Sequence, residues 1–307
     1  MTLPKIIFIN ILTSAYIYVN AILDGMINWT NIISELRKEM NPLNFENRIQ
    51  KYNSSLTKND RKITNFLLAN KATIRDKTII DLSEEIQVSP ASITRFCKKI
   101  SFNTFQQMKF SLIGSSTENR KNDNTFETVY NYYQTIITST QQFFSEEQTS
   151  RIVNLILNTN KVLFCGIGNS GLVAHEFNSR IYRMGIASES VTDAHDLLMK
   201  SSLLNENDLL VCFSNSGKTK PIIDSTKIAK SNKVKIIVVT NFEQTALTEL
   251  ADEVVLISSY KYIDDAKFIN SQLPGLFLLD LLTYKLLNHD DLMNSRQKTL
   301  DAIHKYS

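Results

Sequence analysis

Cysteine is scarce in this chain of 307 residues. The three cysteines, Cys97, Cys165 and Cys212, are odd in number and widely spaced, and none belongs to a CxxC pair. Their spacing therefore lacks the signature of a zinc site or of a dithiol redox centre. Cys165 and Cys212 lie in apolar runs, so we expect free, buried thiols in a reducing cytoplasm.

A strong net charge is also lacking, because the formal net charge is only +3 at pH 7. The charge is nevertheless uneven: residues 40–116 carry 12 Lys and Arg against six Asp and Glu, whereas residues 117–307 carry 19 against 22. The length and a hydrophobic content of 43% suit two globular domains with a sizeable core. A basic segment beside a weakly acidic one is the footprint expected of a nucleic-acid-binding domain joined to a different domain.

A clear targeting signal is lacking as well. Residues 6–23 form an uncharged run that is long enough for a membrane helix, but the run contains Asn10, Asn20 and several hydroxyl side chains. Neither the leading positive charge nor the cleavage site of a signal peptide is clear. Three interpretations of the apolar extension 1–39 therefore stay open: a misassigned translation start, an appended helix, or a native membrane anchor.

An apolar run followed by a small polar turn organises the C-terminal half. Residues 208–213 are rich in strand formers, which predicts a buried parallel strand. Residues 214–219 then read Ser-Asn-Ser-Gly-Lys-Thr, and a helical pattern covers 220–230. Free amides at a helix start, together with turn hydroxyls, can hold an anion. Taken alone, such a turn is also typical of an ordinary serine-rich helix cap.

A second unit of the same kind lies upstream. Residues 161–171 contain an apolar run and then a turn with Gly166, Gly168 and Gly171, before a helical pattern over 172–184. In open parallel sheets, ligands bind at the carboxyl ends of the strands, so the two turns are expected to face one crevice.

The alternation of strands and helices predicts a parallel sheet with helices around it. Helical patterns also cover 127–158 and 268–287. The five predicted strands are 162–166, 186–191, 208–213, 235–240 and 253–258.

These motifs resemble the sugar isomerase (SIS) domain, which binds phosphorylated sugars. The resemblance covers residues 128–288 and rests on four motifs: Gly166-x-Gly168-x-Ser170, Asp193-Ala-His195, Ser214-x-Ser216-Gly217-x-Thr219 and Thr240-Asn241. It implies that Ser214, Ser216 and Thr219 bind the phosphate and that the first turn contacts the sugar. The family usually has two serines after the second glycine, where this chain has Asn169-Ser170, so the sugar stays open. The implied phosphosugar-binding residues are Gly168, Asn169, Ser170, Ser214, Asn215, Ser216, Gly217 and Thr219.

Two short helices with a tight turn are predicted in the basic segment. Ile79, Leu82 and Ile86 form one apolar stripe, and a second stripe follows the break at Val88-Ser89-Pro90. Ser89 suits the N-cap and Pro90 the first helical position. A basic helix alone is more often a solvated face, but the turn and the clustered charge favour a helix-turn-helix whose second helix enters the major groove. Its expected DNA-binding residues are Ser89, Ala91, Ser92, Thr94, Arg95, Lys98 and Lys99.

Residues 88–102, continuing to 105–109, resemble the RpiR-type helix-turn-helix. The resemblance implies a cytoplasmic transcription regulator of carbohydrate metabolism that binds operator DNA as a homodimer or homotetramer and senses a phosphorylated sugar. Ser101 stands where glycine is usual, so this serine must adopt a left-handed backbone or use another turn. The expected domains are a helix-turn-helix domain at 40–116, a linker at 117–127, a SIS domain at 128–288 and a C-terminal tail at 289–307.

Two other functions compete with this hypothesis. Gly166-x-Gly168-x-x-Gly171 also matches a dinucleotide fingerprint, with Glu189 near the position of a ribose-binding carboxylate, but an NAD site leaves the second turn unexplained. An isomerase-type enzyme with an accessory basic domain would need a general base, for which His195, Glu176 and Asp193 are candidates. A DNA-binding domain joined to such a sheet favours sensing over turnover. We expect no catalytic residue, no metal site and no cofactor.

Overall fold

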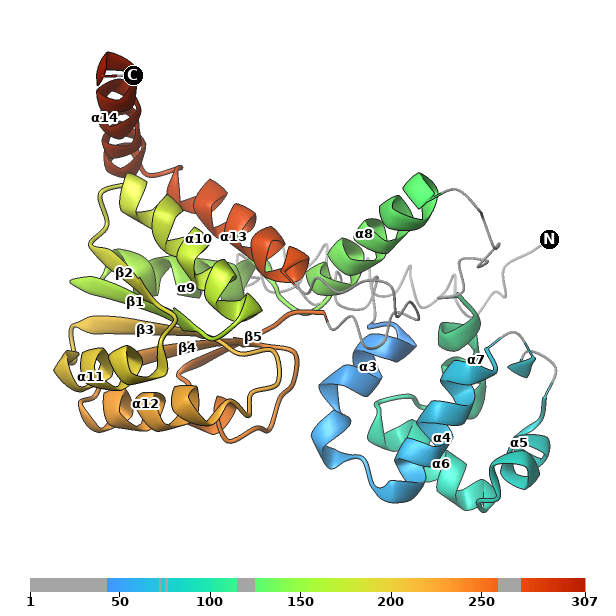
Figure 1. The fold of residues 1–307 in the computed structure, drawn as a ribbon. Coiled ribbons are helices and arrows are strands. Elements are labelled where there is room, and N and C mark those ends of the chain that lie inside the picture. The colour runs from blue at the N-terminus through green and yellow to red at the C-terminus, as the bar shows by residue number, and fades with distance from the viewer. Residues whose placement is uncertain (1–42, 72, 75–76, 115–124, 259–271, 307) are drawn as a thin grey trace, which may run out of the picture. The chain divides into compact units, whose positions relative to one another are not determined.

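The computed structural model describes residues 43–71, 73–74, 77–114, 125–258 and 272–306 (Figure 1). The apolar extension 1–39 and most of the predicted linker lie outside the described residues. Within these ranges, no helix is long and apolar enough to cross a membrane.

The N-terminal domain is entirely helical, as predicted. Its apolar side chains, including Ile63, Leu82 and Phe96, gather in one core that is separate from those of the C-terminal domain. The helices are α3 (Phe45–Lys51), η1 (Asn53–Ser55), α4 (Lys58–Ala69), α5 (Ile79–Ile86), α6 (Pro90–Lys99) and α7 (Phe105–Gly114).

Local capping explains where these helices begin. Thr57 and Asp60 form a reciprocal capping box at the start of α4: Asp60 N donates to Thr57 Oγ1 at 3.3 Å, and Thr57 N donates to Asp60 Oδ2 at 2.9 Å. Ser89 Oγ accepts from Ser92 N at 3.1 Å, and Pro90 opens α6. The predicted cap of α6 is therefore confirmed.

The end of α6 answers the question raised by Ser101. This residue has φ +61°, so the serine adopts the left-handed backbone that glycine tolerates better. Ser101 N donates to Lys98 O at 3.0 Å, and Phe102 N donates to Cys97 O at 2.8 Å. These bonds close the last turn of the helix in the way that a glycine cap usually does.

The C-terminal domain contains one parallel sheet in the order β2-β1-β3-β4-β5. All four neighbouring pairs are parallel, and every residue of β3 is buried. The predicted fold class, a helical domain followed by a five-stranded α/β domain, is confirmed. The strands are β1 (Lys161–Gly166), β2 (Ser188–Val191), β3 (Asp208–Phe213), β4 (Lys235–Thr240) and β5 (Glu253–Leu256).

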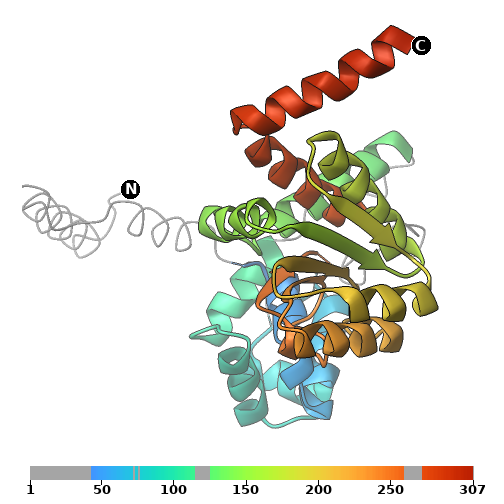
Figure 2. The ribbon, with the colours of Figure 1, turned by 90° about the vertical axis from the view of Figure 1, so that its left-hand side faces the viewer.

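Helices cover both faces of the sheet (Figures 1 and 2). Leu209 and Val211 of β3 face one layer, and Leu210 and Cys212 face the other, as the two-residue period of a strand requires. The first layer contains α9 (Glu146–Leu157), α10 (Asn169–Arg183) and α13 (Leu273–Leu286). The second layer contains α11 (Ala194–Leu203) and α12 (Lys220–Ser231).

The cysteines are free and buried, as predicted. Cys97 lies in the core of the helical domain. Cys165 and Cys212 pair directly across β1 and β3, and their sulfur atoms are 3.4 Å apart. Burial raises the pKa of the Cys97 thiol to about 12.

Four segments differ from the sequence-based expectation. The helical pattern over 127–158 is divided into α8 (Thr125–Gln141) and α9, because Ser145 caps a new helix through Gln148 N. The strand expected at 186–191 begins only at Ser188, and the strand expected at 253–258 ends at Leu256. Residues expected to form a tail contain α14 (Asp290–Tyr306), which has no buried residue and extends away from the sheet (Figures 1 and 2).

Candidate functional site

The turn after β3 brings its hydroxyl groups together. Ser214 N donates to Val239 O of the neighbouring strand at 3.0 Å, which fixes where the turn starts. Ser214 Oγ then lies 3.2 Å from Thr219 Oγ1, while Ser216 Oγ accepts from Lys218 N at 3.2 Å. The side chain of Ser216 is exposed at the carboxyl edge of the sheet. We call residues 214–219 the effector turn.

The helix that follows the effector turn begins with backbone N–H groups that can donate hydrogen bonds to a ligand. Thr219 is the N-cap residue of α12, but its side chain makes no capping hydrogen bond within the described residues, and Pro221 lies in the first turn. The start of α10 likewise lacks a side-chain cap at Gly168. Helix starts without a side-chain cap leave backbone N–H groups and the positive end of the helix dipole for an anion. The exposed Lys218 adds a positive charge beside the effector turn.

The two turns follow neighbouring strands, β1 and β3. Gly166 at the end of β1 pairs in register with Phe213 at the end of β3. A small hollow at this edge is lined by Asn169, Ser170 and Asn215 on its polar side, and its apolar wall is made by Val173, Phe213, Ile257 and Gly275. The sheet therefore brings Asn169, Ser170 and the effector turn to one edge.

Two glycines of the predicted site have positive φ but different surroundings. Gly168 has φ +63°, and an added Cβ would meet no atom within 4 Å. Gly217 has φ +62°, and an added Cβ would collide with Thr245 Oγ1 and lie 2.9 Å from both Thr245 Cβ and Cγ2. The effector turn thus packs against Thr245, a buried residue that the sequence analysis missed.

Two of the three candidate bases for an enzyme, Asp193 and Glu176, are engaged in other contacts. Asp193 caps α11, because its Oδ1 accepts from His195 N at 2.8 Å and from Asp196 N at 3.0 Å. The N–H donors of Asp196 and then His195 lower the pKa of Asp193. Glu176 binds Arg180 Nε at 2.8 Å, within its own helix.

Glu189, the candidate ribose ligand of the NAD alternative, forms ion pairs with Lys161 and Lys200. It pairs in register with Leu163, near the amino end of β1. Its two ammonium partners leave Glu189 poorly suited to a dinucleotide at the opposite, carboxyl edge of the sheet.

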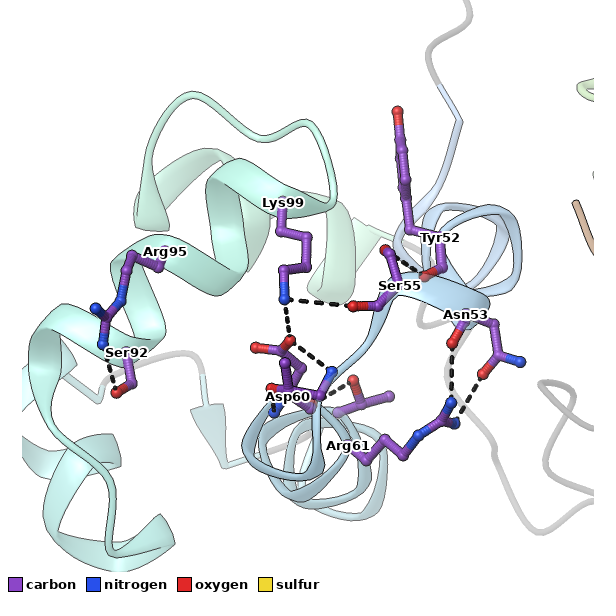
Figure 3. A network of polar contacts seen from close by, with 10 residues as sticks. Tyr52, Asn53, Ser55, Asp60, Arg61, Ser92, Arg95 and Lys99 are labelled. Carbon is purple, nitrogen blue, oxygen red and sulfur yellow. Dashed lines mark hydrogen bonds and ion pairs between the residues drawn. The ribbon is translucent and has the colours of Figure 1, made fainter. Parts of the chain in front are cut away.

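The second helix of the helix-turn-helix presents an exposed polar face. Ala91, Thr94, Arg95 and Lys98 are exposed, whereas Ser92 is half-buried. Thr94 Oγ1 donates to Pro90 O at 3.1 Å, so this hydroxyl is directed along its own helix. Arg95 extends from this face with its guanidinium 3.4 Å from Ser92 Oγ (Figure 3).

Lys99 differs from the other predicted DNA contacts. Its ammonium pairs with Asp60 at the start of α4 and lies 3.4 Å from Ser55 O (Figure 3). Burial alone would raise the pKa of Asp60, but hydrogen bonds from Lys99 and Thr57 outweigh it and lower the pKa. Within the described residues the ammonium of Lys98 makes no hydrogen bond or ion pair, so the two adjacent lysines have different surroundings.

Sequence reasoning missed the residues that connect the two domains. Gln50 of α3 is 1% exposed and donates through Nε2 to Asn241 O at 2.8 Å and to Ile257 O at 2.6 Å. Nothing local marks Gln50, since its partners lie 191 and 207 residues further along the chain. Asn241 belongs to the Thr240-Asn241 motif of the SIS resemblance.

Comparison with known families matches both domains. The profile of the helix-turn-helix domain, rpiR family, matches residues 43–119, and that of the SIS domain matches residues 155–285. An uncharacterized HTH-type transcriptional regulator of Clostridium perfringens is 31% identical over 263 residues, which are 80% of this chain and 94% of that protein.

Solved structures share the fold. The Vibrio vulnificus NanR protein complexed with ManNAc-6P is 21% identical with a TM-score of 0.57, over 86% of this chain and 99% of that chain. A candidate sugar-phosphate isomerase of Listeria monocytogenes is 20% identical with a TM-score of 0.52, over 59% of this chain and 94% of that chain. At these identities the two structures support the fold of the matched regions alone.

Proposed function

This chain belongs to the rpiR family of helix-turn-helix transcription regulators with a SIS domain, and from that premise we propose that it is a phosphosugar-responsive, DNA-binding regulator of carbohydrate metabolism. The helix-turn-helix binds operator DNA as a homodimer or homotetramer. The SIS domain binds a phosphorylated sugar, and this ligand changes the affinity for DNA.

The observation that carries the proposal is that three hydroxyl groups and an uncapped helix start come together at the effector turn. Ser214, Ser216 and Thr219 supply three hydroxyls, and α12 begins there without a side-chain cap. Hydroxyls, free amides and a positive helix end together suit a dianionic phosphate. Asn169 and Ser170 lie beside Asn215 at the hollow, where they can contact the sugar. ManNAc-6P in the NanR complex supports this ligand class.

DNA binding is proposed through α6 and its N-cap residue Ser89. In this proposal the exposed residues Ser89, Ala91, Thr94 and Arg95 contact base edges and the lysines contact phosphates, with Ser92 at the edge of that face. Lys99 is the weakest member of this set, because Asp60 already binds it.

An isomerase is the rival hypothesis. It is disfavoured because two of its three candidate bases are engaged, Asp193 as a helix cap and Glu176 as an ion-pair partner. The relative in C. perfringens is named a transcriptional regulator, which also favours sensing over turnover.

A thermal-unfolding screen with hexose phosphates, amino-sugar phosphates and N-acetylated amino-sugar phosphates tests the ligand class, with NAD as a control. A ligand at about 100 times its Kd should add roughly 2.7 kcal/mol to the free energy of unfolding. We expect stabilisation by one phosphosugar and none by its dephosphorylated form. Stabilisation by NAD alone would contradict the proposal.

The double variant Ser216→Ala, Thr219→Ala tests the phosphate site. It should lose the phosphosugar response and keep its DNA affinity, because both hydroxyls lie in the effector turn and neither lies in the helical domain. An undiminished response in a filter-binding or anisotropy assay would place the phosphate elsewhere.

A further inference from the structure

Helix α3 of the DNA-binding domain has two functional faces. Phe45 and Ile49 are four residues apart and lie in the core of the helical domain. Asn47 and Gln50 are three residues apart on another face, and both are almost fully buried although their side chains are polar. Buried amides need partners, and the partners of these two are in the other domain.

The partners of Gln50 lie where β4 and β5 end. Its amide nitrogen donates to Asn241 O at 2.8 Å, directly after β4, and to Ile257 O at 2.6 Å, directly after β5. Asn241 Nδ2 also donates to Ile257 O at 3.0 Å and to Ser258 O at 2.9 Å. Gln50 therefore inserts into a small, buried hydrogen-bond network at the carboxyl edge of the sheet.

The same network reaches the effector turn. Asn241 N donates to Asn215 O at 3.1 Å, so one residue contacts both the effector turn and Gln50. A few residues later, Thr245 packs against Gly217. A ligand that moves the effector turn must therefore move Asn241 and Thr245 or break their contacts.

At its opposite side α3 holds the end of the recognition helix. Arg48 NH1 donates to Ile100 O at 3.3 Å and to Ser101 O, and its guanidinium lies 4.2 Å from the ring centroid of Phe102. Ile100 is the C-cap residue of α6. One short helix thus contacts both the effector network and the helix proposed to read DNA.

We propose that Gln50 couples the two sites: through Asn241 it senses the state of the effector turn, and through α3 and Arg48 it changes the position of α6. Gln50 is a positioning residue, because it contacts neither DNA nor the expected phosphate position. This inference rests on the proposed function and adds a regulatory contact to it. A ligand shifts the DNA-binding equilibrium only if the two arrangements bind it unequally, and the Asn215–Asn241–Gln50 contacts supply a difference between them.

The test compares Gln50→Met with Asn47→Leu in the full chain. Both replace a buried amide by an apolar side chain of similar size, but Asn47 contacts Ser139 O and Gln142 Oε1 rather than the effector network. DNA affinity is measured with and without the phosphosugar that stabilises the wild type most. The DNA is a fragment that the wild type selects from a random-sequence library.

We expect a wild-type change in DNA affinity of about 5- to 150-fold, the usual range of allosteric coupling. In Gln50→Met this ratio should fall to within about twofold of 1, while the variant still binds sugar and DNA separately. Asn47→Leu should keep most of the ratio. Gln50→Asn, which keeps the amide but is one methylene shorter, serves if the methionine variant does not fold, and the same loss is expected.

Three results would overturn the inference. A folded Gln50 variant with the full wild-type ratio would remove Gln50 from the coupling, and the proposed function would stand. Equal losses in the Gln50 and Asn47 variants would assign the effect to general loosening between the domains. If none of the phosphosugars tested changes the DNA affinity of the wild type, the proposed function is overturned as well.

Discussion

Replacing Gly217 by alanine is the sharpest available perturbation of the effector turn. The backbone there has φ +62°, and for a residue with a Cβ this conformation costs about 1–2 kcal/mol. The added Cβ would also collide with Thr245, and overpacking of this kind typically costs about 1–3 kcal/mol. Together these effects should lower the free energy of unfolding by about 2–5 kcal/mol.

Gly168→Ala is the control without a clash. Gly168 also has a positive φ, +63°, but an added Cβ there has no neighbour within 4 Å. Its ψ of −131° lies in a region that glycine adopts far more readily than other residues, so Gly168→Ala should cost about 1–3 kcal/mol through the backbone alone. A change at Thr245 should therefore alter the stability of Gly217→Ala and leave that of Gly168→Ala unaffected.

Urea denaturation provides the assay, and the relevant transition is the one that the phosphosugar shifts. Thr245→Ala in the Gly217→Ala background should restore part of the lost stability, because it removes two of the three atoms that the new Cβ meets. No rescue of Gly217→Ala by Thr245→Ala, or an equal rescue of Gly168→Ala, would refute the reasoning.

The remaining predictions concern the DNA-binding domain. Arg95→Ala should weaken operator binding in an anisotropy assay by about 1–3 kcal/mol and leave sugar affinity unchanged; unchanged DNA affinity would remove Arg95 from the contacts. Lys98→Ala should reduce the slope of the logarithm of the DNA-binding constant against the logarithm of the salt concentration by about 1. Lys99→Ala should mainly lower the free energy of unfolding, by roughly 1–2 kcal/mol, because Asp60 loses its partner. The pKa of Asp60 is lowered in the folded state, so its contribution is present above the unfolded value of about 3.9 and is lost as the pH falls through the folded pKa. Unfolding followed from pH 6 to pH 2 should show this loss in the wild type and a smaller one in Asp60→Asn; identical profiles would contradict it.

Local signals made much of the fold predictable. Strand β3 and its polar turn stand out because an apolar run ends abruptly in small hydroxyl residues, and β3 and β4 begin and end where the pattern predicted. The cap at Ser89 was predictable for the same reason, since its side chain bonds to a residue three positions along the chain.

Contacts between distant segments were not predictable. Lys99 was placed among the DNA contacts because it follows Lys98 on a basic helix, but its partner Asp60 lies 39 residues earlier and only the tertiary fold brings them together. Gln50 is an ordinary polar residue in the sequence, and its burial depends on carbonyl groups of the other domain. Backbone acceptors of this kind leave no mark in the side-chain pattern.

The three buried cysteines can report local opening of the two domains through their reaction with an alkylating reagent. Cys97 lies in the helical core, whereas Cys165 and Cys212 lie in the sheet. A buried thiol reacts with an alkylating reagent only when its surroundings open, so peptide-resolved mass spectrometry can time the opening of each domain separately. Slower alkylation of the sheet cysteines alone on adding a phosphosugar would mean that ligand rigidifies its own domain without tightening the other. No label or mutation has to be introduced to see this.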